Sequence, residues 1–205
     1  MVTIVDLQSG NIGSVRNMLH RLEVDSMITN CPDAVLRADR IIIPGVGMFN
    51  KSIQNLDAFK GLRSALKRAA RDNRVPILGI CIGMQILMDS SEEGEGRGLG
   101  LVKGRVRKLN APNLKIPHMG WNSVKIRKGN RLFDKLEAEN RFYFVHSFAA
   151  DTESKDDVLA ETTYGKKFCS AIERHNVYGV QFHPEKSHRF GMQLLKNFCE
   201  IPHAV

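Results

Sequence analysis

The feature that most constrains the fold of this chain is a regular alternation of short apolar runs with helical patterns. The runs consist mainly of β-branched and aliphatic residues, as strands buried on both faces do, and they span Val2–Asp6, Asp39–Gly45 and Val75–Ile80. Apolar residues at helical spacing follow each run, over Ile12–Leu22, Ile53–Arg71 and from Gly83 to Asp89. The alternation predicts an α/β fold, with an open, mostly parallel sheet and helices on both of its faces.

After about residue 95 the pattern changes and predicts a strand-rich second half. Strand candidates there are Gly104–Leu109, Val124–Arg127, Arg141–Val145, Val158–Thr163, Phe168–Ile172 and Val177–Phe182. Antiparallel pairs are expected among them, and Gly191–Phe198 is expected to form a closing helix. The sequence contains no internal repeat and no long linker, so one domain over residues 1–205 is expected.

Composition narrows the class of protein. The 205 residues are 42% hydrophobic and 25% charged, which is ordinary for a globular domain. No apolar run approaches the ~20 residues that span a bilayer, and the first residues lack the basic start of a signal peptide. The four cysteines are scattered, without a C-x-x-C pair. These features predict a reduced, cytoplasmic protein without membrane contact.

The net charge of +8 is compatible with a nucleic acid, a phosphorylated substrate or an acidic partner surface. Several basic residues fall along one helical stretch, namely Lys60, Arg63, Lys67, Arg68, Arg71 and Arg74. A solvated helix face is the favoured interpretation of this run, ahead of a binding patch. Because aromatic residues do not interleave with the basic ones, no nucleic-acid partner is expected.

Gly79-Ile80-Cys81-Ile82-Gly83 lies where a predicted strand meets a predicted helix. This is the cysteine counterpart of the nucleophile elbow, a sharp turn that forces the reactive side chain into the open and needs glycines nearby. At a helix N-terminus Cys81 would be favoured as a thiolate, and the Ile82 N–H would be placed to stabilise an oxyanion. A buried structural cysteine is the alternative, but the flanking strand and helix favour a nucleophile.

Gln181-Phe182-His183-Pro184-Glu185 follows the last predicted strand. Pro184 biases His183 towards an extended backbone, in which side chains two residues apart point the same way. Glu185 is therefore expected to orient the His183 imidazole, which completes a triad with Cys81 at the C-terminal ends of strands. A zinc site made by His183, His188 and a cysteine is the alternative, but no ligand spacing supports it, so no metal is expected.

Pro44-Gly45-Val46-Gly47 ends the second predicted strand. Two glycines allow a change of peptide orientation that bulkier residues resist, so the loop is suited to direct an N–H near Gly47 at the developing oxyanion. A plain turn is the alternative. Beside a triad, the catalytic interpretation is favoured.

These motifs resemble those of the class I, triad-type glutamine amidotransferases, above all the glutaminase subunits of imidazole glycerol phosphate synthase. The resemblance covers nearly the whole chain through Gly10-Asn11, Pro44–Gly47, Gly79–Gln85, Ser91–Gly94, Gly98–Gly100, Pro117–Asn122, Tyr143–Ser147 and Gly179–Ser187. The cysteine and histidine–glutamate motifs are shared by many amidotransferases. Pro117–Asn122 and Pro44–Gly47 are more specific to these subunits.

The resemblance implies a role for each matching residue. Cys81, His183 and Glu185 match the nucleophile, the base and its partner. The positions that hold L-glutamine are matched by Gln85, Glu93 and the backbone of Ser147 and Phe148, although family members usually carry tyrosine at position 148. The positions that face the partner subunit are matched by Asn11, Met119, Trp121 and Lys186.

The implied activity is hydrolysis of L-glutamine to glutamate and ammonia through a cysteine thioester, without a cofactor. The ammonia passes to a synthase, which in the resembling family is a (β/α)₈-barrel cyclase of histidine biosynthesis. Three alternatives stay open at this point. They are a paralogous subunit of an amidotransferase that makes amidino sugars for surface polysaccharide, a non-catalytic regulatory or binding subunit, and a stand-alone hydrolase of γ-glutamyl compounds.

Overall fold

Parallel strands form the centre of the main sheet. The computed structural model describes residues 1–8 and 10–203, and its parallel strands run in the order β2-β1-β3-β4-β13. Their bounds are β1 Val2–Val5, β2 Ser26–Thr29, β3 Arg40–Gly45, β4 Ile77–Cys81 and β13 Val177–Val180. The predicted parallel α/β core is therefore confirmed, and β2 is a strand that the sequence pattern did not identify.

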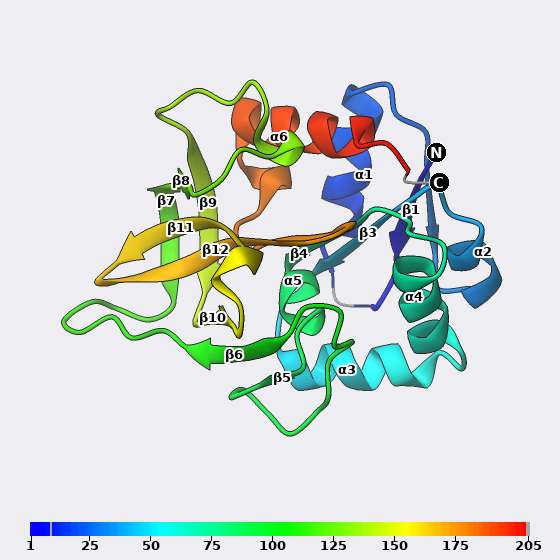
Figure 1. Cartoon of the computed structure of the whole chain (residues 1–205), viewed down its shortest axis with the longest axis horizontal. Coiled ribbons are helices and arrows are strands. Elements are labelled where there is room, and N and C mark those ends of the chain that lie inside the picture. Colours follow the sequence, from blue (N-terminus) through cyan, green and yellow to red (C-terminus); the bar gives the residue numbers. More distant parts are fainter. Residues whose placement is uncertain (9, 204–205) are drawn as a thin grey trace.

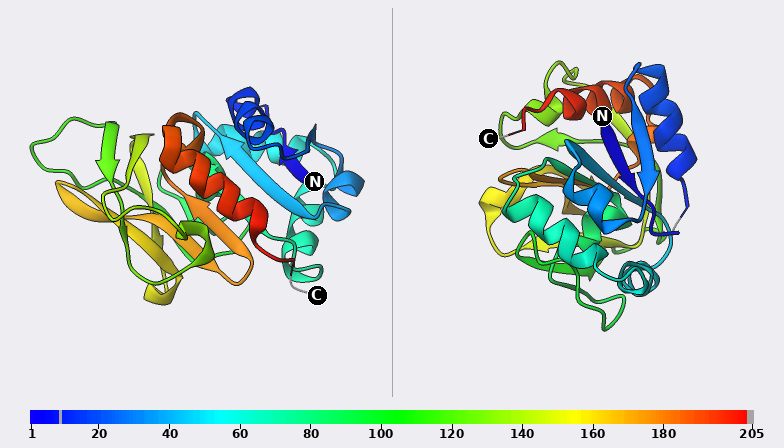
Figure 2. Two further views of the ribbon diagram at one scale, coloured as in Figure 1. Left: turned by 90° about the horizontal axis from the view of Figure 1, so that it is seen from above. Right: turned by 90° about the vertical axis from the view of Figure 1, so that its right-hand side faces the viewer.

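Helices cover both faces of this sheet (Figure 1). α1 and α6 lie on one side, and α3, α4 and α5 lie on the other, as the view from the right in Figure 2 also shows. The helices are α1 Ile12–Arg21, α2 Pro32–Leu36, α3 Phe49–Ala58, α4 Leu62–Arg71, α5 Ile82–Ile86 and α6 His188–Glu200. One continuous buried cluster of aliphatic and aromatic side chains fills the space between the layers.

The second half of the chain extends the sheet with antiparallel pairs, as predicted. β12 pairs antiparallel with β13, β10 and β11, and β10 pairs antiparallel with β6. A separate two-stranded sheet joins β7 to β9. The strands are β5 Ser90–Ser91, β6 Gly104–Lys108, β7 His118–Ser123, β8 Lys125–Ile126, β9 Arg141–His146, β10 Phe148–Thr152, β11 Val158–Tyr164 and β12 Lys166–Arg174. Short 3₁₀ turns are η1 Arg131–Phe133, η2 Lys155–Asp157 and η3 Pro184–Lys186.

The prediction of one helix over Ile53–Arg71 is wrong. The segment belongs to two helices, and Gly61 between them has a φ of +88°. The first helix ends where Phe59 takes an extended backbone, and Gly61 stands directly before the second helix in a left-handed conformation, which glycine adopts without strain. Apolar spacing continues across the break, because both helices bury their inner side on the same sheet.

Both ends of the described chain lie over the start of β3. The Met1 ammonium group is 3.1 Å from the Asp39 carboxylate, and the Arg40 guanidinium donates a hydrogen bond of 2.8 Å to the Ile201 carbonyl. The opposite end of β3 reaches the turn that contains Cys81, since Gly45 pairs with Cys81. The ends are therefore separated from the candidate site by the length of a strand.

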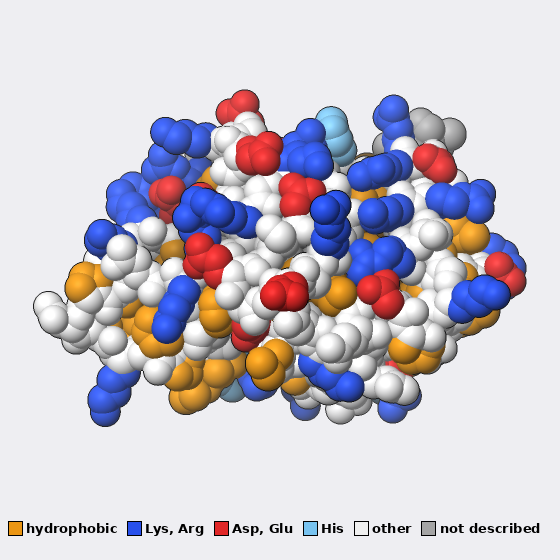
Figure 3. All heavy atoms as spheres, turned by 90° about the horizontal axis from the view of Figure 1, so that it is seen from below, with side chains coloured by type: hydrophobic (Ala, Val, Ile, Leu, Met, Phe, Trp, Pro, Cys, Tyr) orange, Lys and Arg blue, Asp and Glu red, His pale blue; other side chains and the backbone are white. Residues whose placement is uncertain are grey.

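Basic side chains outnumber acidic ones on the face drawn in Figure 3. They are spread among acidic side chains, in agreement with the dispersed basic residues of the sequence. Within the described residues, no helix has the length and apolar character needed to cross a membrane.

Candidate active site

The Cys81 elbow is a strained turn between β4 and α5. Cys81 has φ 54° and ψ −109°, outside the conformations that a cysteine ordinarily adopts, and α5 begins at the next residue. Close approach explains the flanking glycines. A β-carbon on Gly79 would overlap the Gly83 carbonyl, and one on Gly83 would overlap the Ile43 carbonyl of β3. The structure thus has the sharp strand-to-helix turn at Cys81 that the sequence predicts.

Two candidate oxyanion donors lie beside this turn, Gly47 in the segment after β3 and Ile82 at the start of α5. The segment that leaves β3 passes Cys81 directly, because Gly45 is its pairing partner. Gly47 follows with a φ of +99°, and a β-carbon there would meet open space. Gly47 and Ile82 both line the cavity that contains Cys81. The left-handed conformation, not crowding, is what favours glycine at position 47.

His183 and Glu185 form a buried pair behind the cysteine. His183 Nδ1 lies 2.7 Å from Glu185 Oε1, and the two side chains are 1% and 0% exposed. The explanation based on the sequence is wrong in one respect. Only His183 is extended, and Glu185 lies in the 3₁₀ turn η3, so the turn and not strand alternation brings the carboxylate back to the ring.

The environment of His183 favours its charged form. Burial lowers the pKa of the ring, but its interactions with Cys81 and Glu185 outweigh burial and raise the pKa to about 9. With Nδ1 hydrogen-bonded to Glu185, Nε2 is the atom available to exchange a proton. Nε2 has no hydrogen-bond partner among the described residues. A neutral His183 can therefore take the proton of the Cys81 thiol, and the charged ring that results is stabilised by Cys81 and Glu185.

Ser187 holds the histidine turn in place, a role that the sequence pattern did not reveal. Its hydroxyl donates a 2.6 Å hydrogen bond to the His183 carbonyl and accepts one of 3.0 Å from the Tyr143 N–H. The His183 N–H in turn donates to the Tyr143 carbonyl over 2.8 Å. Phe182 anchors the same segment by stacking on Phe142, with ring centroids 4.0 Å apart.

A cavity of about 260 Å³ brings the predicted site residues together. Its lining contains the following residues predicted from the sequence: Gly47, Cys81, Ile82, Gln85, Glu93, Ser147, Phe148 and His183. Glu185 lies behind His183, outside this lining. The lining also includes His146 and Pro117, which the prediction did not assign to the glutamine site.

Buried amides link Gln85 in this cavity to Cys81. Gln85 Nε2 donates to the Phe148 carbonyl over 3.2 Å and to Gln181 Oε1 over 3.1 Å. Gln181 Nε2 lies 3.6 Å from Cys81 Sγ and donates to it. Gln181 was missed because an alternating strand pattern does not identify which inward polar side chain will meet the cysteine. Glu93 accepts a 2.6 Å hydrogen bond from the Phe49 N–H at the start of α3.

The residues expected to face a partner differ from one another in exposure and in contacts. Met119 and Trp121 are 62% and 45% exposed, unusual values for large apolar side chains. Exposed Lys186 lies over the Tyr143 ring, 5.7 Å from its centroid. Asn11 is half-buried and donates a hydrogen bond to Glu185 Oε1, so it also touches the triad.

The architecture and the site can be compared with known proteins. The model of the family described as "Glutamine amidotransferase class-I" matches residues 3–201. The chain belongs to this family. A relative from Methanococcus maripaludis, named imidazole glycerol phosphate synthase subunit HisH 2, is 46% identical over 98% of this chain and 99% of its own length. A relative from Bdellovibrio bacteriovorus, named imidazole glycerol phosphate synthase subunit HisH, is 47% identical over 98% and 100%.

Solved structures of more distant amidotransferases have the same fold. A crystal structure titled glutamine amidotransferase matches with a TM-score of 0.77 at 16% identity, over 98% of both chains. PurLQS from Thermotoga maritima matches with a TM-score of 0.73 at 18% identity, over 97% of this chain and 96% of that one. The predicted fold class and the resemblance to the amidotransferase family are thereby confirmed.

This amidotransferase also contains a buried histidine pair that its predicted mechanism does not use. His118 Nδ1 and His146 Nε2 are 3.0 Å apart, and His146 Nδ1 is 2.8 Å from the Phe148 carbonyl. Since a carbonyl only accepts, both rings carry their proton on Nδ1. Burial lowers the pKa of His118 to about 4 and that of His146 to about 3. Both rings are neutral at pH 7.

Acid should therefore destabilise the protein through these two rings. Below pH 6.5 each ring binds a proton in the unfolded chain but not in the folded one, so the free energy of unfolding falls as the pH is lowered towards about 4. The expected slope is about 1.4 kcal/mol per pH unit for each ring. Urea unfolding at pH values from 7.5 to 4.5 measures the slope of the unfolding free energy against pH. The slope should decrease in His118→Gln but not in His20→Gln, whose side chain is exposed. Equal slopes in the two variants would contradict this assignment.

Replacing Glu185 by glutamine should lower the rate of glutamate release by roughly 10² to 10⁴-fold, because an amide neither fixes the His183 tautomer nor stabilises its charge. The pKa of His183 should fall as well, which a pH–rate profile measures. Glu137→Gln is the matched control, since Glu137 forms an exposed ion pair with Arg189. A variant of Glu185 with the wild-type profile would mean that His183 acts without a carboxylate.

Proposed function

We propose that this chain, as one domain, is the glutaminase subunit of an imidazole glycerol phosphate synthase. The observation that carries the proposal is the convergence of Cys81, His183 and the predicted glutamine-binding residues on one small cavity, with Glu185 directly behind the histidine. The names of the relatives that are 46% and 47% identical over nearly their whole length support the histidine pathway.

The reaction follows from the order of these groups. Cys81 Sγ attacks the side-chain amide carbon of glutamine while His183 Nε2 takes the thiol proton. N–H groups near Gly47 and at Ile82 hold the oxyanion. His183 then gives its proton to the leaving nitrogen, which departs as ammonia and leaves a γ-glutamyl thioester. Water loses a proton to His183, attacks the thioester and releases glutamate, and Cys81 regains its proton.

Gln85, Glu93 and the backbone of Ser147 and Phe148 hold glutamine in this proposal. Gln85 already donates to the Phe148 carbonyl, so the two elements on either side of the cavity are joined before a substrate enters. The Glu93 carboxylate is suited to the substrate's ammonium group, because it lines the cavity and accepts only one hydrogen bond from the described residues, that of the Phe49 N–H.

Ammonia needs a protected route, because in neutral water it is mostly protonated and no longer nucleophilic. We propose that the receiving partner is a (β/α)₈-barrel cyclase that forms a heterodimer with this chain. Met119, Trp121 and Lys186 are exposed and support a docking face for this barrel. Large exposed apolar side chains are typical of interfaces. Four free cysteines support a reducing, cytoplasmic location.

The test is glutamate release from glutamine by the purified chain, alone and with the histidine-pathway barrel and its ligand. We expect strong stimulation by the loaded barrel, and weaker stimulation of Trp121→Ala because its docking face is truncated. Lys60→Ala, at an exposed turn outside that face, should be stimulated like wild type.

Absence of stimulation, with Cys81 still labelled by a glutamine-analogue electrophile, would overturn the histidine-pathway assignment and favour the amidino-sugar branch. An unreactive Cys81 would overturn the glutaminase itself. Full activity without any partner would favour a stand-alone hydrolase.

A further inference from the structure

A second, larger cavity lies away from Cys81, at the opposite ends of the same strands. It has a volume of about 710 Å³, in the range of pockets that bind small organic molecules. Pro76 and Val177, at the starts of β4 and β13, form part of its wall. These two strands carry Cys81 and lead to His183 at their other ends. The cavity is therefore separate from the glutamine site.

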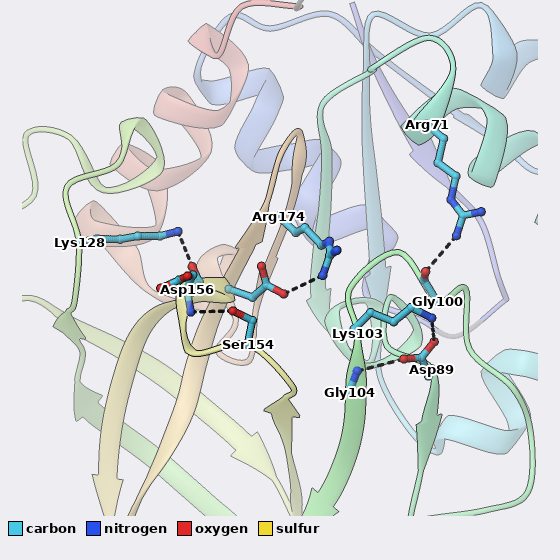
Figure 4. A network of polar contacts seen from close by, with 10 residues as sticks. Arg71, Asp89, Gly100, Lys103, Gly104, Lys128, Ser154, Asp156 and Arg174 are labelled. Carbon is cyan, nitrogen blue, oxygen red and sulfur yellow. Dashed lines mark hydrogen bonds and ion pairs between the residues drawn. The ribbon is translucent and has the colours of Figure 1, made fainter.

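Its charged lining residues are all basic. They are Arg71, Arg74, Lys103, Arg131 and Arg174, with His175 beside them. Two of them are neutralised by carboxylates, since Lys103 lies 3.1 Å from Asp89 and Arg174 lies 3.2 Å from Asp157. Figure 4 shows the Lys103–Asp89 pair. It also shows Arg71 donating to a neutral acceptor, the Gly100 carbonyl, and this hydrogen bond is 3.1 Å long.

Arg71, Arg74 and Arg131 form no ion pair within the part of the chain that the structure describes. The basic run from Lys60 to Arg74, for which the sequence favours a solvated helix face, therefore falls into two groups. Arg63 and Arg68, earlier in the run, have Asp57 and Asp72 as partners. Only the last two arginines of the run reach the cavity. The solvated-face interpretation therefore does not account for the whole run.

The remaining wall is apolar and partly aromatic. Buried Tyr178 lies in it with Leu101 and Ile201. Two lining residues also have backbone conformations that cost free energy, since Arg74 has φ 51° and His175 has φ 56°. Non-glycine residues with such φ values concentrate at functional sites.

We propose that this cavity binds a small organic phosphate with two or more negative charges and a planar or apolar body. Three guanidinium groups, which have no carboxylate partner among residues 1–8 and 10–203, supply charge-assisted hydrogen bonds to phosphate oxygens. The Tyr178 ring and the aliphatic wall cover the body of the ligand. A neutral ligand would not interact with the charges of the arginines, and a bare inorganic anion would not contact the apolar wall.

Isothermal titration calorimetry on the full chain tests this, with ATP, inorganic pyrophosphate and adenosine as probes. ATP should bind best, pyrophosphate more weakly, and adenosine least. Affinity for ATP should fall at least tenfold in the double variant Arg74→Glu/Arg131→Glu, because two attractive contacts become repulsive. The matched control is Arg37→Glu/Lys60→Glu, which makes the same change of charge at exposed positions outside the cavity. It should bind ATP within about twofold of wild type.

Cys81→Ser protein should bind ATP as wild type does, which separates this proposal from the proposed glutaminase function. Arg74→Gln/Arg131→Gln replaces the reversed pair if circular dichroism shows that the latter is unfolded, and it too should lose affinity. No binding of ATP or pyrophosphate would overturn the proposal. Equal losses in the cavity and control variants would also overturn it, because they would show attraction to the net charge only.

Discussion

Replacing Cys81 by alanine should reduce glutamate release from glutamine by a factor on the order of 10⁴ or more. The thioester route requires a thiolate at this position, and members of a catalytic triad fail as a unit when one is removed. The loss should appear with and without the partner, because stimulation acts on a nucleophile that is no longer present. A coupled assay for glutamate measures the rate, and mass spectrometry after incubation with a glutamine-analogue electrophile reports whether the elbow is labelled.

The matched control is Cys31→Ala. Cys31 is exposed at the start of α2 and has no contact with the cavity, so its loss should leave the rate within about twofold of wild type. If Cys81→Ala retained a substantial rate and the label moved to another cysteine, the nucleophile would have been misassigned.

Replacing Gly83 by alanine should lower the free energy of unfolding by about 4 kcal/mol or more, which only a few kinds of substitution do. The new β-carbon would overlap the backbone carbonyl of Ile43, and a central strand cannot move aside as a flexible side chain can. Chemical denaturation monitored by circular dichroism measures the change. Glutamate release should fall as well, because displacing α5 from β3 moves the Ile82 N–H.

Gly13→Ala is the control for this substitution. Gly13 lies in the first turn of α1, and a β-carbon added there would have nothing within 4 Å, so alanine should be neutral or stabilise the helix by up to about 1 kcal/mol. Equal stability of Gly83→Ala and wild type would show that the elbow relaxes and that its glycines are not required by packing.

The sequence predicts the parallel half of the fold because strands buried on both faces are apolar throughout and are easily distinguished from helices. It predicts the second half less well. The segment that forms β7 is too irregular in sequence to predict a core strand, and it is indeed only half buried, with Met119 and Trp121 pointing outwards. In the parallel half, β2 was the exception, because it is short and only partly buried and its side chains have little apolar signature.

Local motifs predict the triad because each catalytic group sits in a recognisable turn. Contacts between distant segments leave no such signal. The hydrogen bond from Asn11 to Glu185 joins residues from opposite ends of the chain, and the contact of Gln181 with Cys81 depends on the pairing of β13 with β4. The His118–His146 pair likewise depends on the register of β7 against β9, in which these two residues are direct partners.

The contacts of Met1 and Ile201 with the start of β3 make the protein a candidate for circular permutation. Met1 contacts Asp39, and Ile201 contacts the next residue, Arg40. A short flexible linker can therefore join these two regions without crossing the cavity that contains Cys81. New termini at exposed Gly129 would interrupt no strand of the parallel centre. A permuted chain that still releases glutamate would show that the cavity around Cys81 assembles without the natural order of the chain.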